Sequence, residues 1–249
     1  MIANTTYYQG ARMINSANQL TGNVYQTYSD VFGYFYLKQN NKILAEENAR
    51  LRAMIEKSYL KFTTNEIIIN DTTYKQQYTY IDAQVISSST GKRNNYLMLN
   101  KGFNQGIRKN MAVISSNGIV GIVNNVSAGF SSVMSLLHAE TKISAKLKKS
   151  NAAGSIIWEG GNFKKGTLSD IPSHIRIFTG DTVITSGFSY DFPEGIVIGT
   201  IAEYKINPGD NFYTIKINFS TNFNELGYVY VVKNLFKNEL LKLKEAQHE

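Results

Sequence analysis

The sequence predicts a mainly β protein in which a long N-terminal helix, forming a coiled coil, precedes two small six-stranded β-barrels. Residues 11–61 contain no proline and carry a leucine heptad. After residue 61, short β-branched and aromatic segments alternate with glycine-bearing turns, as in sandwiches and small barrels. Because no helical pattern of about 10–15 residues separates these segments, a βαβ arrangement is excluded.

Composition narrows the class of protein. Hydrophobic residues make up 43% of the 249 residues, and aromatic residues 12%. A chain of this composition can bury a core and is not expected to be disordered. The absence of cysteine excludes a disulfide scaffold, a thiol nucleophile and a Cys-ligated metal. With three histidines, no metal or other cofactor is expected.

Charge indicates which partners to expect, and hydropathy indicates whether the sequence contains a membrane span or a signal peptide. The net charge is +7, but arginine is scarce and the lysines are spread along the chain, so nucleic acid is not an expected partner. No apolar run approaches the roughly 18 residues of a membrane span. The first ten residues also lack the basic and apolar regions of a signal peptide.

The rear half of the predicted helix carries a dimerisation seam. Leucines recur every seven residues, and a second series of two asparagines and an isoleucine recurs between them. The seam residues are Leu37, Asn41, Leu44, Asn48, Leu51 and Ile55. Leucine at d favours two parallel helices, and asparagine at a fixes the register. The seam therefore predicts a parallel homodimer.

The remaining chain divides into three expected regions. Residues 62–158 form the first barrel, residues 159–233 form the second, and residues 234–249 form a charged tail. A loose internal repeat, which starts at Gly106 and again at Gly180, favours two similar units over one large sandwich. Strand exchange between the barrels stays open, and open edge strands would let copies stack by β-addition.

Several motifs, in their order and spacing, resemble the family of the rod shape-determining protein MreC. These are the segments 44–51 (LAEENARL), 95–102 (NYLMLNKG), 117–123 (NGIVGIV), 180–187 (GDTVITSG) and 192–199 (FPEGIVIG). Each motif is weak by itself. Together they extend the likeness over roughly residues 20–233.

The resemblance implies an elongated protein on the periplasmic side of the inner membrane, with a single-pass anchor that is not found in this sequence. It implies a non-catalytic scaffold that maintains cell shape by organising peptidoglycan synthesis as dimers and head-to-tail assemblies. The implied partners are MreD, RodA and the elongation transpeptidase.

Two other functions are weighed against the scaffold. A chymotrypsin-like hydrolase would need a triad, with His138 or His174 as base. No nucleophile motif such as G-x-S-x-G accompanies them, and a loop position for His138 and an exposed one for His174 are preferred. A periplasmic adaptor of an efflux or secretion system would need a returning helix, which the pattern lacks.

Two groups of residues are candidates for a partner surface. Phe188, Tyr190 and Phe192 crowd one loop between two glycines, although Phe192 could instead tuck under a barrel. Lys142 and Lys146 share parity on one predicted strand and suit an acidic partner. A simple solvated face is the preferred interpretation of the lysines.

Overall fold

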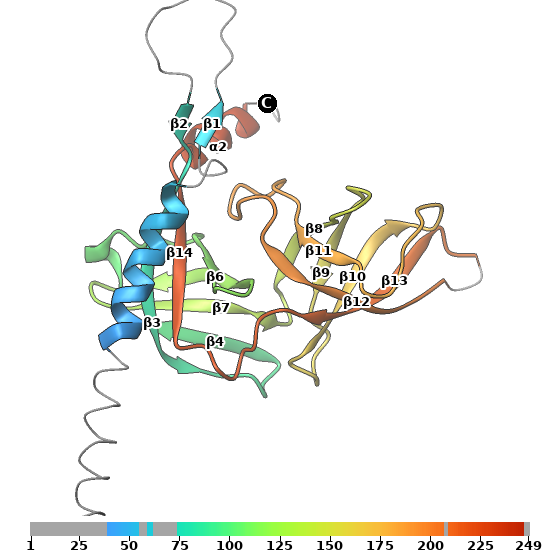
Figure 1. Ribbon diagram of the computed structural model, residues 1–249, viewed down its shortest axis with the longest axis horizontal. Coiled ribbons are helices and arrows are strands. Elements are labelled where there is room, and N and C mark those ends of the chain that lie inside the picture. Colours follow the sequence, from blue (N-terminus) through green and yellow to red (C-terminus); the bar gives the residue numbers. More distant parts are fainter. Residues whose placement is uncertain (1–38, 55–58, 62–73, 207–208, 247–249) are drawn as a thin grey trace, which may run out of the picture. The chain divides into compact units, whose positions relative to one another are not determined.

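The computed structural model describes residues 39–54, 59–61, 74–206 and 209–246 (Figure 1). The chain divides into two units, Met1–Leu44 and Ala45–Glu249. The described residues of the first unit, 39–44, are helical, and the helix continues to residue 54 in the second. A coiled coil over residues 11–38 therefore lies outside the described residues. Of the seam, Leu37 and Ile55 also lie outside them.

The predicted helix ends earlier than expected. Residues 59–61 form strand β1 (Tyr59–Lys61), which pairs antiparallel with β2 (Tyr74–Gln76). Backbone pairing with residues 74–76 thus overrides the helical pattern that the sequence extends to residue 61. Another strand candidate, residues 62–70, falls outside the described residues.

Twelve strands form two closed barrels, which confirms the mainly β fold. The first barrel has the order β14-β3-β4-β7-β6-β5. Its strands are β3 (Tyr78–Ser88), β4 (Asn94–Leu99), β5 (Ala112–Ile114), β6 (Ile119–Val126), β7 (Ser131–His138) and β14 (Tyr228–Asn234). The second barrel has the order β10-β13-β12-β11-β8-β9. Its strands are β8 (Lys142–Leu147), β9 (Ala153–Ile157), β10 (Lys165–Pro172), β11 (Thr182–Thr185), β12 (Val197–Lys205) and β13 (Phe212–Phe219).

The two barrels share one strand order. Starting from β8, the second barrel reads β8-β9-β10-β13-β12-β11, so that β5, β6 and β7 occupy the places of β11, β12 and β13. Register shifts also match, at Val113/Ile114 in one barrel and Val183/Ile184 in the other. The internal repeat seen in the sequence is thus a repeat in topology. In the first barrel, the place of β8 is taken by β14, from the far end of the chain.

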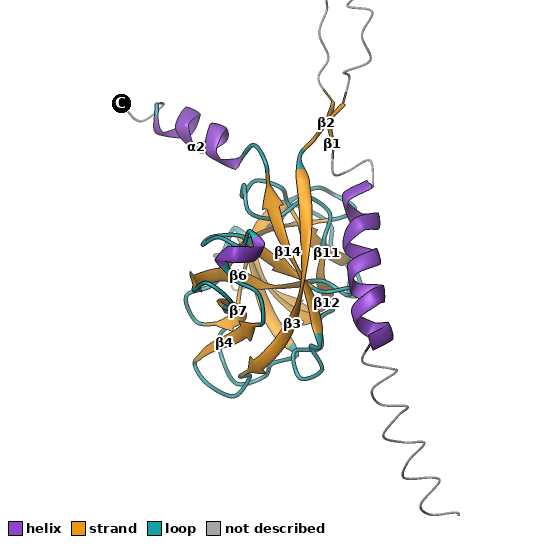
Figure 2. Ribbon diagram, turned by 90° about the vertical axis from the view of Figure 1, so that its left-hand side faces the viewer, coloured by secondary structure: helices purple, strands orange, loops and turns teal. Residues whose placement is uncertain are grey.

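The strands are divided differently from the expected ranges 62–158 and 159–233. Strands β8 and β9 belong to the second barrel, and β14 closes the first by pairing with β3 and β5. Figure 2 shows β14 beside β3. The boundary therefore falls between His138 and Lys142. Because every barrel strand has a neighbour on both sides, the expected open edges are wrong for these barrels, and closure removes β-addition at them.

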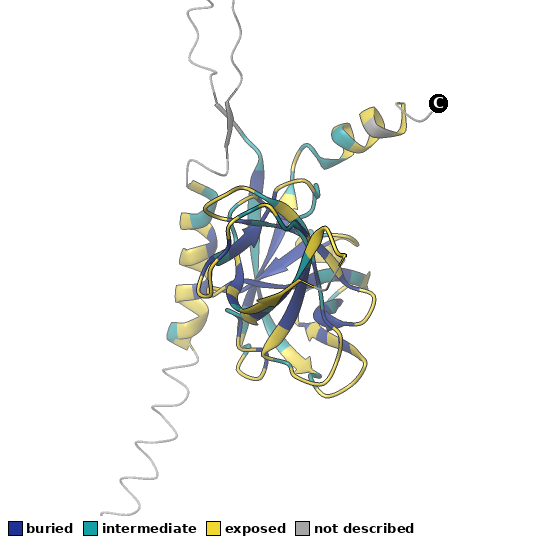
Figure 3. Cartoon of the chain, turned by 90° about the vertical axis from the view of Figure 1, so that its right-hand side faces the viewer, coloured by how far each residue is buried: buried dark blue, intermediate teal, exposed yellow. Residues whose placement is uncertain are grey.

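The strands of both barrels carry many buried residues, which are dark blue in Figure 3. The core of the first includes Val113, Val123 and Val231, all fully buried. The barrels meet at the turn before β6. There, Gly118 lies against the backbone of Val197, and Thr221 Oγ1 donates a hydrogen bond of 2.8 Å to the carbonyl of Ile119.

The charged tail forms a short helix, α2 (Lys237–Glu245), and the 3-10 turn η2 (Phe103–Gln105) precedes β5. Within the part of the chain that the structure describes, every helix is too short or too polar to cross a bilayer.

Candidate functional site

One face of the helix packs on the first barrel. Ala45 and Ala49 are buried, and Ala49 joins the core cluster that contains Tyr230. The Arg52 guanidinium lies 5.0 Å from the centre of the Tyr230 ring. Burial raises the pKa of the Tyr230 phenol, and the charge of Arg52 opposes this shift. The small alanine side chains let the helix backbone approach the barrel closely.

The helix surface beside the alanine face carries large apolar side chains that are exposed to solvent. Leu51 is 49% exposed and Met54 is 60% exposed. Leu44 is 53% exposed, and Asn41 and Asn48 are also exposed. The four seam positions that the structure describes are therefore all exposed in a single copy. The dimer itself stays a prediction.

The loop between β11 and β12 divides the three aromatic candidates. Phe188 is 72% exposed and Tyr190 is half-buried. Phe192 is 1% exposed, so its place on a partner surface is wrong. Its burial follows from the turn around Thr185, whose Oγ1 donates to the carbonyl of Pro193 at 2.6 Å and accepts the Ile196 N–H at 2.9 Å. This turn holds the Phe192–Pro193 segment against the barrel.

Residues from the C-terminal end of the chain hold the same loop, a contact that the sequence analysis missed. The Asn234 amide donates to the Tyr190 carbonyl at 3.0 Å, and Lys237 forms an ion pair with Asp191. Lys237 Nζ also donates to the carbonyl of Asn110 in the first barrel, at 2.6 Å. One lysine therefore joins the two barrels. No short-range signal could reveal this contact, because its partners are far apart in sequence.

The two candidate lysines differ in their surroundings. Both lie on β8 with the same parity, and Lys142 is exposed. Lys146 forms an ion pair with Glu194, and its side chain is 13% exposed. Nearby, Lys149 pairs with Asp181, and its hydrogen bond lowers the pKa of that carboxyl group. The charges of Lys146 and Lys149 are thus paired with carboxylates of the second barrel, and Lys142 remains exposed.

Neither histidine lies in a recognisable catalytic arrangement. His138 ends β7 and is buried, whereas a loop position was expected. Its Nε2 lies 3.0 Å from Tyr96 Oη, and its Nδ1 accepts the Glu140 N–H at 3.1 Å. Both ring nitrogens are therefore engaged in structural contacts. His174 is exposed, as expected. Across the described ranges, no group of three or more His, Cys, Asp or Glu residues could hold a metal ion.

Comparison with known proteins gives a consistent match. The family model "Rod shape-determining protein MreC, barrel core" matches residues 85–233. The cell shape-determining protein MreC of Listeria monocytogenes is 30% identical over 161 residues, which cover 64% of this chain and 55% of that protein. The Escherichia coli protein of the same description is 24% identical over 191 residues, covering 75% and 47%. The chain thus spans about half the length of these relatives.

Solved structures show the same fold. A structure of Listeria monocytogenes MreC superimposes with a TM-score of 0.59 at 26% identity, covering 92% of this chain and 96% of that one. The complex of penicillin-binding protein PBP2 and MreC from Helicobacter pylori has a chain that matches with a TM-score of 0.50 at 20% identity. That match covers 64% of this chain and all of the other.

Proposed function

Because this chain belongs to the MreC family of rod shape-determining proteins, we propose that it is a non-catalytic scaffold of the cell-elongation machinery. In this proposal, two copies dimerise through their helices and organise peptidoglycan-synthesis proteins so that the cell keeps its shape. The periplasmic side of the inner membrane is the proposed location, with membrane attachment in the full-length protein. A related structure is described as the major periplasmic domain of the cell shape-determining filament MreC.

The two-faced helix is the observation that carries this proposal. Its alanine face is buried against the first barrel, while the seam leucines Leu44 and Leu51 remain exposed. An exposed apolar stripe on a helix with heptad spacing is what a second helix covers in a parallel coiled coil. Because the alanine face ties the helix to its barrel, dimerisation would also fix where the two sets of barrels lie.

The proposed partners follow from the family. The Helicobacter pylori relative is solved in complex with PBP2, so an elongation transpeptidase of this kind is the first proposed partner. MreD and RodA are proposed from the family resemblance. On this chain, the exposed Phe188 with Tyr190, and the exposed Lys142, are the proposed docking residues, whereas Lys146 is already paired with Glu194. The loop with Phe188 is held by Thr185 and Asn234, so it would meet a partner with little ordering cost.

Changing Leu44→Lys and Leu51→Lys together is expected to yield monomers. Each lysine would place a charge in the seam, opposite the same charge of the second copy. We expect the dimer dissociation constant to rise by about 1000-fold or more, equivalent to about 4 kcal/mol. Sedimentation equilibrium of the purified chain and of the variant measures this change.

Glu46→Lys is the matched control. It adds the same two units of positive charge at an exposed helix position that faces away from the seam. We expect this control to dimerise like the unchanged chain. A double leucine variant that stays dimeric would contradict the assigned seam.

A further inference from the structure

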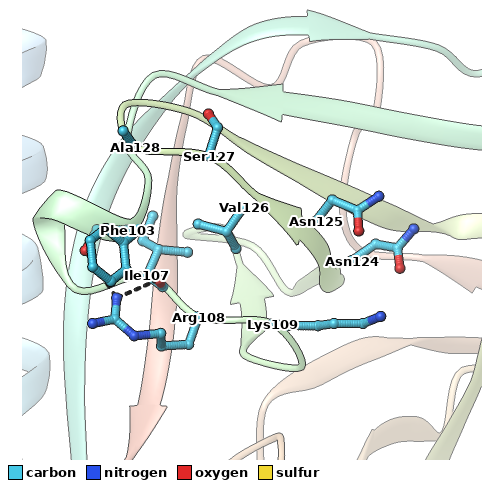
Figure 4. A pocket seen from close by; sticks show the side chains of 9 residues that line it. All are labelled: Phe103, Ile107, Arg108, Lys109, Asn124, Asn125, Val126, Ser127 and Ala128. Carbon is cyan, nitrogen blue, oxygen red and sulfur yellow. Dashed lines mark hydrogen bonds between the residues drawn. The ribbon is translucent and has the colours of Figure 1, made fainter.

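The first barrel has a pocket whose residues take no part in the proposed dimerisation and are not among the proposed docking residues. It has a volume of about 430 Å³ and lies between the turn that follows η2 and the turn that joins β6 to β7 (Figure 4). Ile107 and Val126 give it an apolar floor, and Phe103 forms one wall. Cations and amides surround this floor, and no carboxylate lines it.

Arg108 is held in a fixed position at one end of the pocket. Its Nη1 donates to the carbonyls of Phe103 and Ile107, at 2.9 and 2.8 Å. The guanidinium also stacks 4.4 Å from the centre of the Phe103 ring. These contacts leave Nη2 and Nε as donors on a group whose orientation is already set. A preorganised guanidinium of this kind suits a carboxylate.

The other end of the pocket carries further donors. The side chains of Lys109, Asn124 and Asn125 extend in one direction, away from Arg108 (Figure 4). Among the described residues, neither Arg108 nor Lys109 forms an ion pair with a carboxylate. The pocket therefore has a cation at each end of an apolar floor.

The charge of the whole barrel reinforces this arrangement. Residues 78–138 and 228–234 contain six Lys and Arg residues against a single acidic residue, Asp82, which gives a net charge of +5. Asp82 is itself paired with Lys101. Most of the chain's net charge of +7 thus lies on this barrel. Such a field attracts anionic partners and raises their association rates.

We propose that this pocket binds a short acidic segment of a partner protein, in which two carboxylates flank an apolar side chain. One carboxylate would meet Arg108 and the other Lys109, while the apolar side chain covers Val126. The amides of Asn124 and Asn125 can donate to and accept from a peptide backbone. An apolar floor favours such a peptide over a glycan, whose hydroxyl groups would lose water there without partners.

The test is a titration of the full chain with a fluorescein-labelled pentapeptide that alternates glutamate and leucine. Fluorescence anisotropy is expected to show saturable binding, and the matching glutamine–leucine peptide is expected to show none. Arg108→Gln with Lys109→Gln should weaken binding by at least about tenfold, equivalent to about 1.4 kcal/mol. Asn125→Glu, an exposed position that would bring a carboxylate into the pocket, should weaken it similarly.

Lys92→Gln with Arg93→Gln is the matched control. It removes one lysine and one arginine from exposed positions of the same barrel, outside the pocket. We expect less than about a twofold effect from this control. Equal weakening by both double variants would overturn the proposal, because it would show general charge attraction. Absence of saturable binding would also overturn it.

The remaining alternative is that the pocket binds a carboxylated glycan and not a peptide. Competition with polygalacturonate, which is such a glycan, tests this alternative. Binding of this glycan that depends on Arg108 and Lys109, with no binding of the peptide, would assign the pocket to a glycan and overturn the peptide. The proposal does not rest on dimerisation, since the pocket lies within one barrel of one copy. Absence of peptide binding in the titration would not count against the proposed dimer seam.

Discussion

Changing Gly199→Ala or Gly121→Ala is expected to lower the free energy of unfolding by about 3 kcal/mol each, the upper range for overpacking a tight site. A Cβ on Gly199 would lie 2.1 Å from the Asn218 carbonyl oxygen, and one on Gly121 would lie 2.1 Å from that of Met134. The contacts are with backbone atoms of paired strands, which cannot move without breaking the barrel. Urea denaturation of each variant measures the loss.

The two glycines occupy equivalent places in the two barrels. Gly121 is on β6 opposite Ser135, and Gly199 is on β12 opposite Phe219. Gly91→Ala is the control, because a Cβ there would meet nothing within 4 Å. We expect that control to unfold like the unchanged chain. Equal stability of Gly199→Ala and Gly91→Ala would contradict the close strand approach that we describe.

Changing Thr185→Val is expected to cost about 2–4 kcal/mol and to loosen the loop with Phe188. Thr185 is fully buried, and valine keeps its shape but not its hydroxyl group. The Pro193 carbonyl and the Ile196 N–H would then lose their bonds to Thr185 Oγ1. Each buried group left without a partner costs about 1–3 kcal/mol. Urea denaturation measures the loss, and faster amide hydrogen exchange over residues 186–196 would show the loosened loop.

Two further variants isolate the hydroxyl group of Thr185. Thr185→Ser keeps the hydroxyl and should retain most of the stability. Thr182→Val makes the same substitution on β11 at a half-buried position whose hydroxyl forms no hydrogen bond within the described residues. If Thr185→Val and Thr182→Val had the same effect, the loop would not depend on these bonds.

The barrel strands could be predicted from the sequence because their signals are local. Alternating apolar residues placed Lys142–Leu147 with the bounds that β8 has. The repeat that starts at Gly106 and Gly180 matched the shared topology. Closure could not be predicted this way. The first barrel is completed by β14, which pairs with β3 more than 140 residues earlier in the sequence, and no local pattern reports such pairing.

For the candidate sites, too, local features could be predicted from the sequence and long-range packing could not. Heptad spacing placed the seam residues on one helix face, and alanine at every fourth position from Ala45 could have revealed the buried face beside it. The burial of Phe192 depends on how its loop packs on the barrel. Loop composition alone therefore wrongly placed Phe192 on a partner surface. For the pocket, adjacent Arg108 and Lys109 are visible in the sequence. That Asn124 and Asn125 line the same pocket could not be predicted, because this depends on the register of β6.

The seam can be tested most directly by a disulfide, because the chain contains no cysteine. In a parallel dimer in register, residue 51 of one copy faces residue 51 of the other, within the roughly 4.4–6.8 Å between Cα atoms that a disulfide spans. Under mild oxidation, Leu51→Cys is expected to give a covalent dimer, and Glu46→Cys, on the far side of the helix, is expected to stay largely monomeric on a non-reducing gel. Equal or slower crosslinking of Leu51→Cys would contradict a dimer built on this helix.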